Sequence, residues 1–264
     1  MADDILVSII ADDIFSRNWM SLLVVRDWRT RLANEFAYST GFADPKQAFL
    51  RQPDILLADV DNFARNPGIL SEINAYTAAS QWVRVIFVGS SVETRVLSRV
   101  PPAHFGGYLL KDEIGTSLTW AVSIAAAGRL VFTPSTHQLA VESGYEPNPH
   151  FTVLHGQSYP GLTPHQSEIA RLAVIFSLNR RDLADELKIS DQWSYGVVSE
   201  LYTRLGLDEL DSGSENLLTL IQENQIIKSH LETIIQEMGE SKKAKDLETL
   251  AFHLITLPIF DMDV

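Results

Sequence analysis

The stretch from Pro53 to Asp59 constrains the fold most, because it is an apolar run that ends in a single carboxylate. Residues 55–58 are all apolar, and turn-forming residues follow Asp59. A short apolar run between turn signals predicts a strand that is buried on both faces. In an open α/β sheet, ligands bind just beyond the carboxyl ends of such strands. Asp59 is therefore expected at the functional edge of a parallel sheet.

Two other predicted strands lead to the same edge. Residues 5–10 form an apolar run that precedes Asp12 and Asp13, and residues 107–110 end at Lys111. Three carboxylates and one ammonium gathered there would bind a divalent metal and favour an anion on Asp59. The sequence thus predicts an acidic site with one balancing cation.

Strand and helix patterns alternate through the first half of the chain. Alternation with short links predicts a parallel, doubly wound α/β sheet. The expected strands are 5–10, 36–38, 54–58, 83–88 and 107–110, and the expected helices are 16–33, 44–49, 69–79, 93–100 and 117–127.

The acidic pair, the later aspartate and the strand Gly107-Tyr108-Leu109-Leu110-Lys111 resemble the receiver domain of bacterial two-component response regulators. The resemblance implies a CheY-like sheet of order 2-1-3-4-5. It also implies Asp59 as the phosphoacceptor and Lys111 as the phosphate partner. The implied magnesium ligands are Asp12, Asp13 and the Asp61 carbonyl, and the implied switch residues are Ser90 and Tyr108.

The chain departs from the receiver pattern at two places. Gly89 stands where the family has Thr or Ser, with Ser90 one residue later, and Asn62-Phe63 replace the usual Met-Pro. The alternative is a pseudo-receiver that keeps the fold without taking phosphate.

Beyond residue 132 the pattern changes twice. Residues 133–160 are rich in Pro, Gly and polar residues and are expected as a linker, with a short helix at 135–141. From residue 161 the period becomes helical. Thr163-Pro164-His165-Gln166 forms a capping box, Asn179 opens a second helix, and Ser190 caps a third that stops at Gly206. The expected domains are 1–132, 161–210 and a helical extension at 211–264.

Residues 161–210 resemble the LuxR-type helix-turn-helix of the NarL/FixJ class. The resemblance rests on Leu162-Thr163-Pro164, Glu168, Leu183-Ala184, Leu187, Ile189-Ser190 and Leu205-Gly206-Leu207, with one extra residue near 175–178. It implies specific DNA binding by a third helix. Candidate DNA contacts are Arg180, Arg181, Gln192, Trp193, Ser194, Tyr195 and Arg204. The alternative is a helix kept for its shape, with Trp193, Tyr195 and Val197 as a protein-binding face.

The extension carries apolar residues at alternating spacings of three and four, with Asn224 among them. This a/d pattern is typical of paired helices, in which one buried Asn sets the register. The predicted homodimer seam comprises Leu217, Leu220, Asn224, Ile227, Leu231, Ile234 and Met238. Alternatively this helix packs on its own chain, where a last helix with Leu247, Leu250, Leu254 and Ile255 covers it.

Composition narrows the function classes. The net charge is −13, and residues 161–210 carry five basic and eight acidic side chains, which argues against loose, charge-driven binding to nucleic acid. The chain has no cysteine, no membrane-length apolar run and no signal-peptide pattern, so we expect a cytoplasmic protein without membrane contact. Nucleophile-elbow, P-loop and dinucleotide patterns are absent, and no enzymatic turnover is expected.

Two functions follow from these patterns. The first is a DNA-binding transcriptional regulator of the response-regulator kind, controlled by phosphorylation, with Mg²⁺ and a sensor kinase, or by partner binding. The second is a signalling adaptor that binds no DNA, with a pseudo-receiver and a degenerate helix-turn-helix.

Overall fold

The computed structural model describes residues 4–38, 52–63, 68–79, 82–99, 101–144, 151–156, 162–207 and 244–261. The chain divides into two compact units, residues 2–157 with 258–264 and residues 158–257. We call the first the sheet unit and the second the helical unit.

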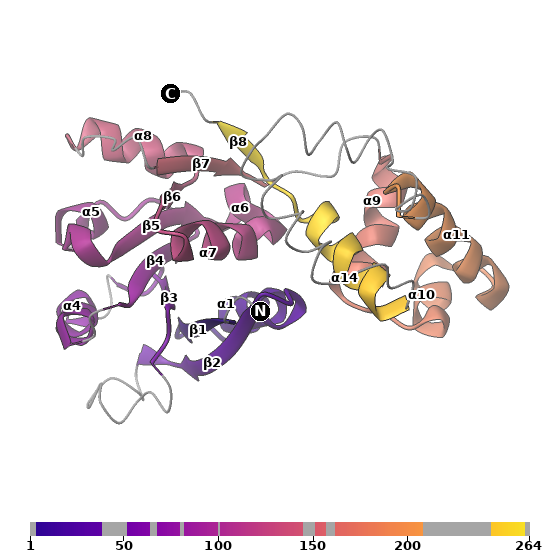
Figure 1. The fold of residues 1–264 in the computed structure, drawn as a ribbon, viewed down its shortest axis with the longest axis horizontal. Helices are drawn as coiled ribbons and strands as arrows, with labels where there is room; N and C mark the ends of the chain where they lie inside the picture. Colours follow the sequence, from indigo (N-terminus) through magenta and orange to yellow (C-terminus); the bar gives the residue numbers. More distant parts are fainter. Residues whose placement is uncertain are drawn as a thin grey trace. The chain divides into compact units, whose positions relative to one another are not determined.

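The sheet unit is built on one sheet, whose described strands follow the order β2-β1-β3-β4-β5-β6-β7-β8 from bottom to top in Figure 1. Neighbouring strands are parallel except β7 and β8, which are antiparallel. The expected order 2-1-3-4-5 is confirmed for the first five strands. The strands are β1 (Ile5–Ile10), β2 (Thr30–Phe36), β3 (Ile55–Asp59), β4 (Arg84–Gly89), β5 (Phe105–Leu110), β6 (Leu130–Phe132), β7 (Phe151–His155) and β8 (Ile259–Asp261).

Helices cover both faces of this sheet, as a doubly wound fold requires. They are α1 (Ile14–Arg26), α4 (Ile69–Ala79), α5 (Arg95–Arg99), α6 (Lys111–Ile114), α7 (Leu118–Ala126) and α8 (Pro134–Glu142), with 3₁₀ turns η1 (Pro102–His104) and η2 (Gly115–Ser117). Helices α1 and α7 contact each other on one face. Helices α4, α5 and α8 add Ile73, Val96 and Ala140 to a core with Phe87 and Tyr108.

A row of aromatic rings crosses the face of the sheet that α4 and α8 cover. The ring centroids of Phe63 and Phe87 lie 6.2 Å apart, those of Phe87 and Phe105 6.1 Å, and those of Phe105 and Phe132 5.9 Å. Edge-to-face and offset pairs at these separations add to the stability that burial of the rings provides. The row ties β6, outside the expected five strands, to the same core.

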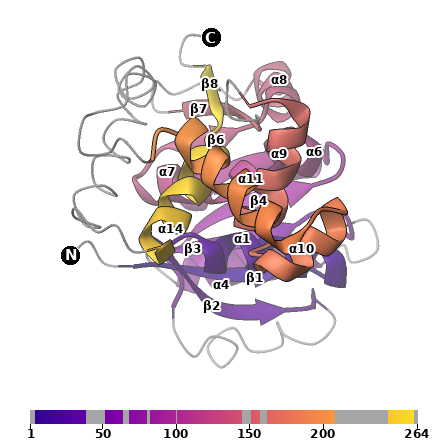
Figure 2. The same ribbon diagram turned by 90° about the vertical axis from the view of Figure 1, so that its right-hand side faces the viewer.

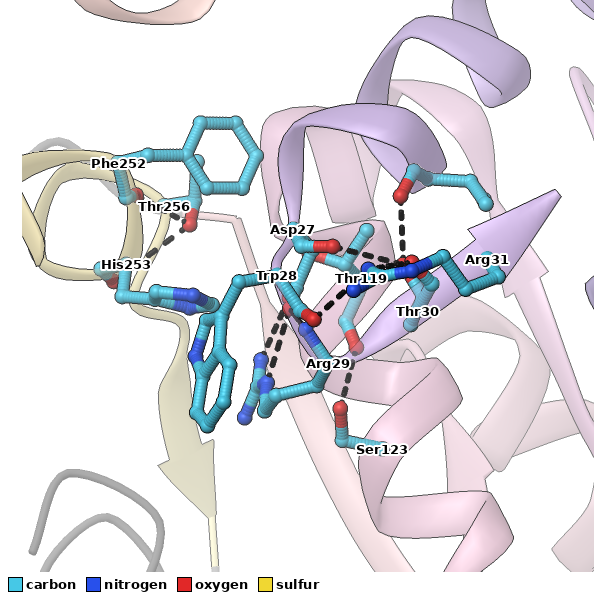
Figure 3. Close-up of polar contacts among 11 residues, drawn as sticks. Asp27, Trp28, Arg29, Thr30, Arg31, Thr119, Ser123, Phe252, His253 and Thr256 are labelled. Carbon is cyan, nitrogen blue, oxygen red and sulfur yellow. Dashed lines mark hydrogen bonds and ion pairs between the residues drawn. The ribbon is translucent and has the colours of Figure 1, made fainter. Parts of the chain in front are cut away.

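The expected helix at 16–33 and the expected strand at 36–38 were wrong in their bounds. Helix α1 ends at Arg26, and β2 already begins at Thr30. The Asp27 carboxylate accepts hydrogen bonds from the Arg29 backbone N–H at 2.9 Å and from Nη2 at 2.7 Å (Figure 3). This local turn competes with the helix and ends it, which is a known effect of Asp side chains.

Residues 133–160 were expected as a linker with a short helix at 135–141. That helix is confirmed as α8, and the described part of the segment also contains the strand β7. The capping box at Thr133 starts α8, and β7 then pairs with β6. Burial explains the difference, because Thr152, Val153 and Leu154 in β7 are buried. After β7 the chain leaves for the helical unit and returns to β8, where Ile259 pairs with His155.

The helical unit is shown from the side in Figure 2. It comprises α9 (Pro164–Ala170), the π-helical segment η3 (Arg171–Ile175), α10 (Arg180–Leu187), α11 (Asp191–Arg204) and α14 (Ala244–Ile255). All three expected caps are confirmed: Thr163 forms a capping box, Asn179 caps α10, and the Ser190 hydroxyl accepts a bond from Trp193 N. Gly206 has a φ of 72°, which suits a glycine at the end of α11.

The π-helical segment lies next to the place where one extra residue was expected. The Phe176 N–H donates to the Arg171 carbonyl at 3.0 Å, a bond five residues long rather than four. Such a wide turn absorbs a residue without breaking the helix. The following Ser177 has a φ of 55°, which redirects the chain into α10.

Helix α14 matches the expected last helix, with Leu250, Leu254 and Ile255 buried. The Thr256 hydroxyl donates to the Phe252 carbonyl at 2.7 Å and closes its end (Figure 3). The expected helix at 44–49 and the whole predicted dimer seam, residues 217–238, lie outside the described residues. Among the described helices, none has the length and apolar character that crossing a bilayer requires.

Candidate functional site

The sheet brings Asp59 and Lys111 together from two strands. Asp59 is the last residue of β3, Lys111 directly follows β5, and Lys111 Nζ lies 2.8 Å from Asp59 Oδ2. Asp59 is only 1% exposed. Burial works to lower the pKa of Lys111, but hydrogen bonds to Asp59 and Asp61 outweigh it, and the pKa is raised. The lysine therefore stays charged beside the buried carboxylate.

Asp61 contributes its side chain to this site, whereas the sequence predicted a role for its carbonyl. Asp61 Oδ2 accepts from Lys111 Nζ at 2.6 Å and from Ser90 Oγ at 2.7 Å, and Oδ1 accepts from Ser90 N at 2.6 Å. Burial works to raise the pKa of Asp61, but these bonds from Lys111 and Ser90 lower it below its ordinary value. Asp61 is therefore an anion at neutral pH.

Two partners of the site were not found from the sequence. Ser16 Oγ accepts a hydrogen bond from Lys111 Nζ at 2.7 Å, and the buried Tyr38 hydroxyl donates to the Asp59 carbonyl at 2.7 Å. Burial, with the nearby Asp59, raises the pKa of Tyr38 well above its ordinary value. Neither residue lies in a recognisable motif, and only the folded chain brings them to Asp59.

The expected magnesium ligands do not form a carboxylate cluster. The Asp13 side chain caps α1 by accepting from Ser16 N at 2.7 Å, and this bond lowers the pKa of Asp13. In the part of the chain that the structure describes, no three Asp, Glu, His or Cys residues are grouped so that they could hold a metal ion. The three carboxylates are thus not grouped as a metal site, and binding of Mg²⁺ by Asp12, Asp13 and the Asp61 carbonyl stays a prediction.

The two predicted switch residues both fasten the loop after β4. Ser90 binds Asp61, while the buried Tyr108 hydroxyl accepts from Glu93 N at 2.6 Å and donates to the Ser91 carbonyl at 3.2 Å. Burial raises the pKa of Tyr108 to about 12, so the hydroxyl remains protonated. The loop is thus held at both ends.

The glycine that departs from the receiver pattern has a steric cause. A Cβ at Gly89 would lie 2.5 Å from Val60 Cγ2 and 3.4 Å from Asp61 Oδ1. The first distance is shorter than contacts that real Cβ atoms make, so a threonine at this position requires Val60 to move. Ser90, one residue later, supplies the hydroxyl instead.

In the helical unit, α10 and α11 bring together most of the predicted DNA contacts. Trp193 is 65% exposed and Tyr195 63% exposed, and Gln192 and Arg181 are also exposed. The Arg180 guanidinium lies 5.6 Å from the centre of the Tyr195 ring. A cation over a tyrosine face is held by the ring's quadrupole. Arg180 is therefore positioned by α11 although it belongs to α10.

Two predicted contacts are placed differently. Ser194 is fully buried, and its hydroxyl donates to the Asp191 carbonyl at 2.7 Å, so the prediction that it reads bases was wrong. Ser194 lies on the side of α11 that faces the core, whereas its neighbours Trp193 and Tyr195 are exposed. Arg204 is exposed at the other end of α11 and lies 3.7 Å from Glu200.

A pocket of about 530 Å³ lies beside the start of α10. Its lining includes Arg180, Arg181, Tyr195, Tyr202 and Glu248. The Glu248 carboxylate of α14 accepts from Ser177 Oγ at 2.6 Å. An acid from the extension beyond the helix-turn-helix therefore lines the same pocket as the two arginines.

No protein-family model matches the chain, and no curated protein matches it. Solved response regulators are similar to it. The RcsB response regulator of Salmonella typhimurium is 18% identical over 84% of this chain and 100% of its own, with a TM-score of 0.42. ChrA, from a heme-sensing two-component system, is 19% identical over 84% and 98%, with a TM-score of 0.40. RcsB in a DNA complex is 18% identical over 80% and 100%, with a TM-score of 0.45. The function is therefore proposed from the geometry of this chain.

Proposed function

We propose that this protein is a response-regulator-like, DNA-binding transcriptional regulator, controlled at Asp59 and Lys111 by phosphorylation or by a partner. It would act as a homodimer in the cytoplasm through the seam at 217–238. One observation carries the proposal: α11 exposes Gln192 and Tyr195 beside Arg180 and Arg181. That surface belongs to a chain whose sheet unit carries a buried carboxylate–lysine pair.

The helical unit offers the groups that a recognition helix needs. In a helix-turn-helix, the second helix of the motif enters the major groove and a neighbouring helix contacts the backbone. Arg180 and Arg181 would then hold phosphates, and Gln192 and Tyr195 would meet base edges. Because the chain has a net charge of −13, binding to arbitrary DNA should be weak.

DNA selection followed by titration tests this proposal. Genomic fragments selected at low salt should contain a preferred sequence. For each tenfold increase in salt concentration, the logarithm of the affinity for that sequence should fall by about 0.9 for every phosphate that the protein neutralises. Replacing Arg180 and Arg181 with Ala should weaken binding to every sequence alike and flatten the salt dependence. Gln192→Ala should instead relax the preference at one base.

Arg171→Ala is the matched control, because it removes one exposed positive charge of the same unit outside α10 and α11. It should change affinity less than Arg181→Ala. If no fragment gives a sequence-preferring complex, the chain is a signalling adaptor, and the exposed Trp193 and Tyr195 are its protein-binding face.

A further inference from the structure

The hydrogen bonds around Asp59 leave Lys111 no spare donor. The ammonium group carries three N–H bonds. Lys111 Nζ lies 2.7 Å from Ser16 Oγ, 2.8 Å from Asp59 Oδ2 and 2.6 Å from Asp61 Oδ2. An anion that arrives at Asp59 must therefore replace one of these three acceptors.

Asp61 is the acceptor that resembles such an anion. Its two oxygens accept three hydrogen bonds, from Lys111 Nζ, Ser90 N and Ser90 Oγ. Its own backbone N–H donates to Asp59 Oδ1 at 2.9 Å, so the turn places the side chain directly beside Asp59. Charge-assisted bonds of this kind are the strong ones in proteins. A charged oxygen group thus already fills the donor set next to Asp59.

The loop after β4 is fastened by this arrangement. Ser90 is bound to Asp61, and Tyr108 binds the loop at Ser91 and Glu93. Gly89, which precedes Ser90, has no side chain, and a Cβ there would lie 3.4 Å from Asp61 Oδ1. The site and its loop therefore hold together without any added group.

We propose that the Asp61 carboxylate is a built-in ligand of an oxyanion site beside Asp59. It takes the Lys111 and Ser90 donors that a phosphoryl group on Asp59, or a free phosphate ion, would use. Wild-type protein consequently holds this site in its anion-bound arrangement and resists phosphorylation. The inference rests on the proposed function only in treating Asp59 as the control site, and its test reads the site without DNA.

The chemistry defines the competition. In transfer from acetyl phosphate, an Asp59 carboxylate oxygen forms a bond to phosphorus, the bond from phosphorus to the acetyl oxygen breaks, and acetate leaves with the electron pair. The new phosphoryl oxygens then need hydrogen-bond donors, because they add negative charge beside the Asp61 carboxylate. Lys111 and Ser90 become available only when Asp61 releases them.

Removing the Asp61 carboxylate should open the site. Full-length wild type, Asp61→Ala and Asp61→Asn are incubated with acetyl phosphate in magnesium-containing buffer, and the intact proteins are weighed. We expect about tenfold more phosphorylated protein for Asp61→Ala than for wild type, because charge-assisted bonds are freed. Asp61→Asn keeps the shape of the side chain without its charge, and it should also exceed wild type.

Two controls locate the effect. Asp112→Ala removes an exposed carboxylate adjacent to Lys111 in the sequence and should behave as wild type. Adding Asp59→Asn to Asp61→Ala should abolish the gain in mass. Titration with inorganic phosphate, followed by ³¹P NMR, separates a bound free ion from a covalent phosphoryl group.

The proposal is overturned if wild type is modified as readily as Asp61→Ala. It is also overturned if both Asp61 variants, shown to be folded by circular dichroism, gain neither mass nor bound phosphate. Neither outcome depends on DNA binding, so failure here and failure of the proposed regulator are distinguishable.

Discussion

The Tyr108 hydroxyl accepts a hydrogen bond from the Glu93 backbone N–H at 2.6 Å, which joins β5 to the loop after β4. Tyr108→Phe removes this acceptor from a buried position and should destabilise the protein by about 1–3 kcal/mol. Urea unfolding measures the change. Tyr195→Phe is the matched control, because Tyr195 is 63% exposed, and it should change stability by less than about 0.5 kcal/mol. Equal effects of the two substitutions would contradict a structural role for the Tyr108 hydroxyl.

The stability of the protein should depend on pH through Asp61. Its pKa in the folded chain lies below the ordinary value of 3.8. Asp61 therefore contributes stability that is fully present above this ordinary value and is lost as the pH falls through the folded pKa. The difference in unfolding free energy between wild type and Asp61→Asn should be steady between about pH 7 and about pH 5 and should shrink as the pH is lowered below 3.8. A difference that stays constant with pH would show that the carboxylate charge is not its source.

Two glycines should respond to the same substitution in opposite ways. Gly89→Ala places a Cβ 2.5 Å from Val60 Cγ2 and should cost about 1–3 kcal/mol through overpacking. Gly196 lies inside α11, where a Cβ meets nothing within 4 Å, so Gly196→Ala should stabilise the protein by about 1 kcal/mol. Thermal unfolding of both variants, compared with wild type, gives the two signs. A stable Gly89→Ala protein would mean that Val60 moves aside at little cost.

The predicted seam can be tested without shortening the chain. Truncation before residue 217 would also remove β8, which is part of the sheet. Leu220→Lys with Ile227→Lys instead places charges at two seam positions and should give a monomer by light scattering. The same charges at Gln222 and Ser229, off the a/d positions, should leave a dimer. A dimer in both double variants would assign these positions to packing within one chain.

Apolar runs between turn signals are local features, so the sequence predicted β1, β3, β4 and β5 close to their observed bounds. The second strand was expected at 36–38 but lies at Thr30–Phe36. The order of the five strands was implied by the resemblance to receiver domains, and the sheet confirms it. The sequence also predicted the starts of α9, α10 and α11, since Thr163, Asn179 and Ser190 act through bonds to nearby backbone atoms. Strands β6 to β8 were missed, because their burial depends on partners elsewhere in the chain. Thr152, for example, reads as a polar loop residue but is buried in β7, where its hydroxyl accepts a bond from Arg129.

The site was predicted in part for the same reason. Asp59 and Lys111 end two strands, and that position is readable from the sequence. The side-chain role of Asp61 is not readable, because it depends on Ser90 lying 29 residues later in the chain. Ser194 was misplaced because its neighbours Trp193 and Tyr195 are exposed, and only the rotation of α11 about its axis distinguishes the three.

The pairing of His155 with Ile259 makes residues 156–258, which include the whole helical unit, the loop of one β-hairpin. Two adjacent, hydrogen-bonded strand ends anchor that loop, so the helical unit is tethered at both of its ends rather than at one. The entropic cost of closing such a loop grows only with the logarithm of its length, so a large insertion adds little to it. A sheet unit in which a short turn joins His155 directly to Ile259 should therefore fold without the helical unit and keep all its described strands.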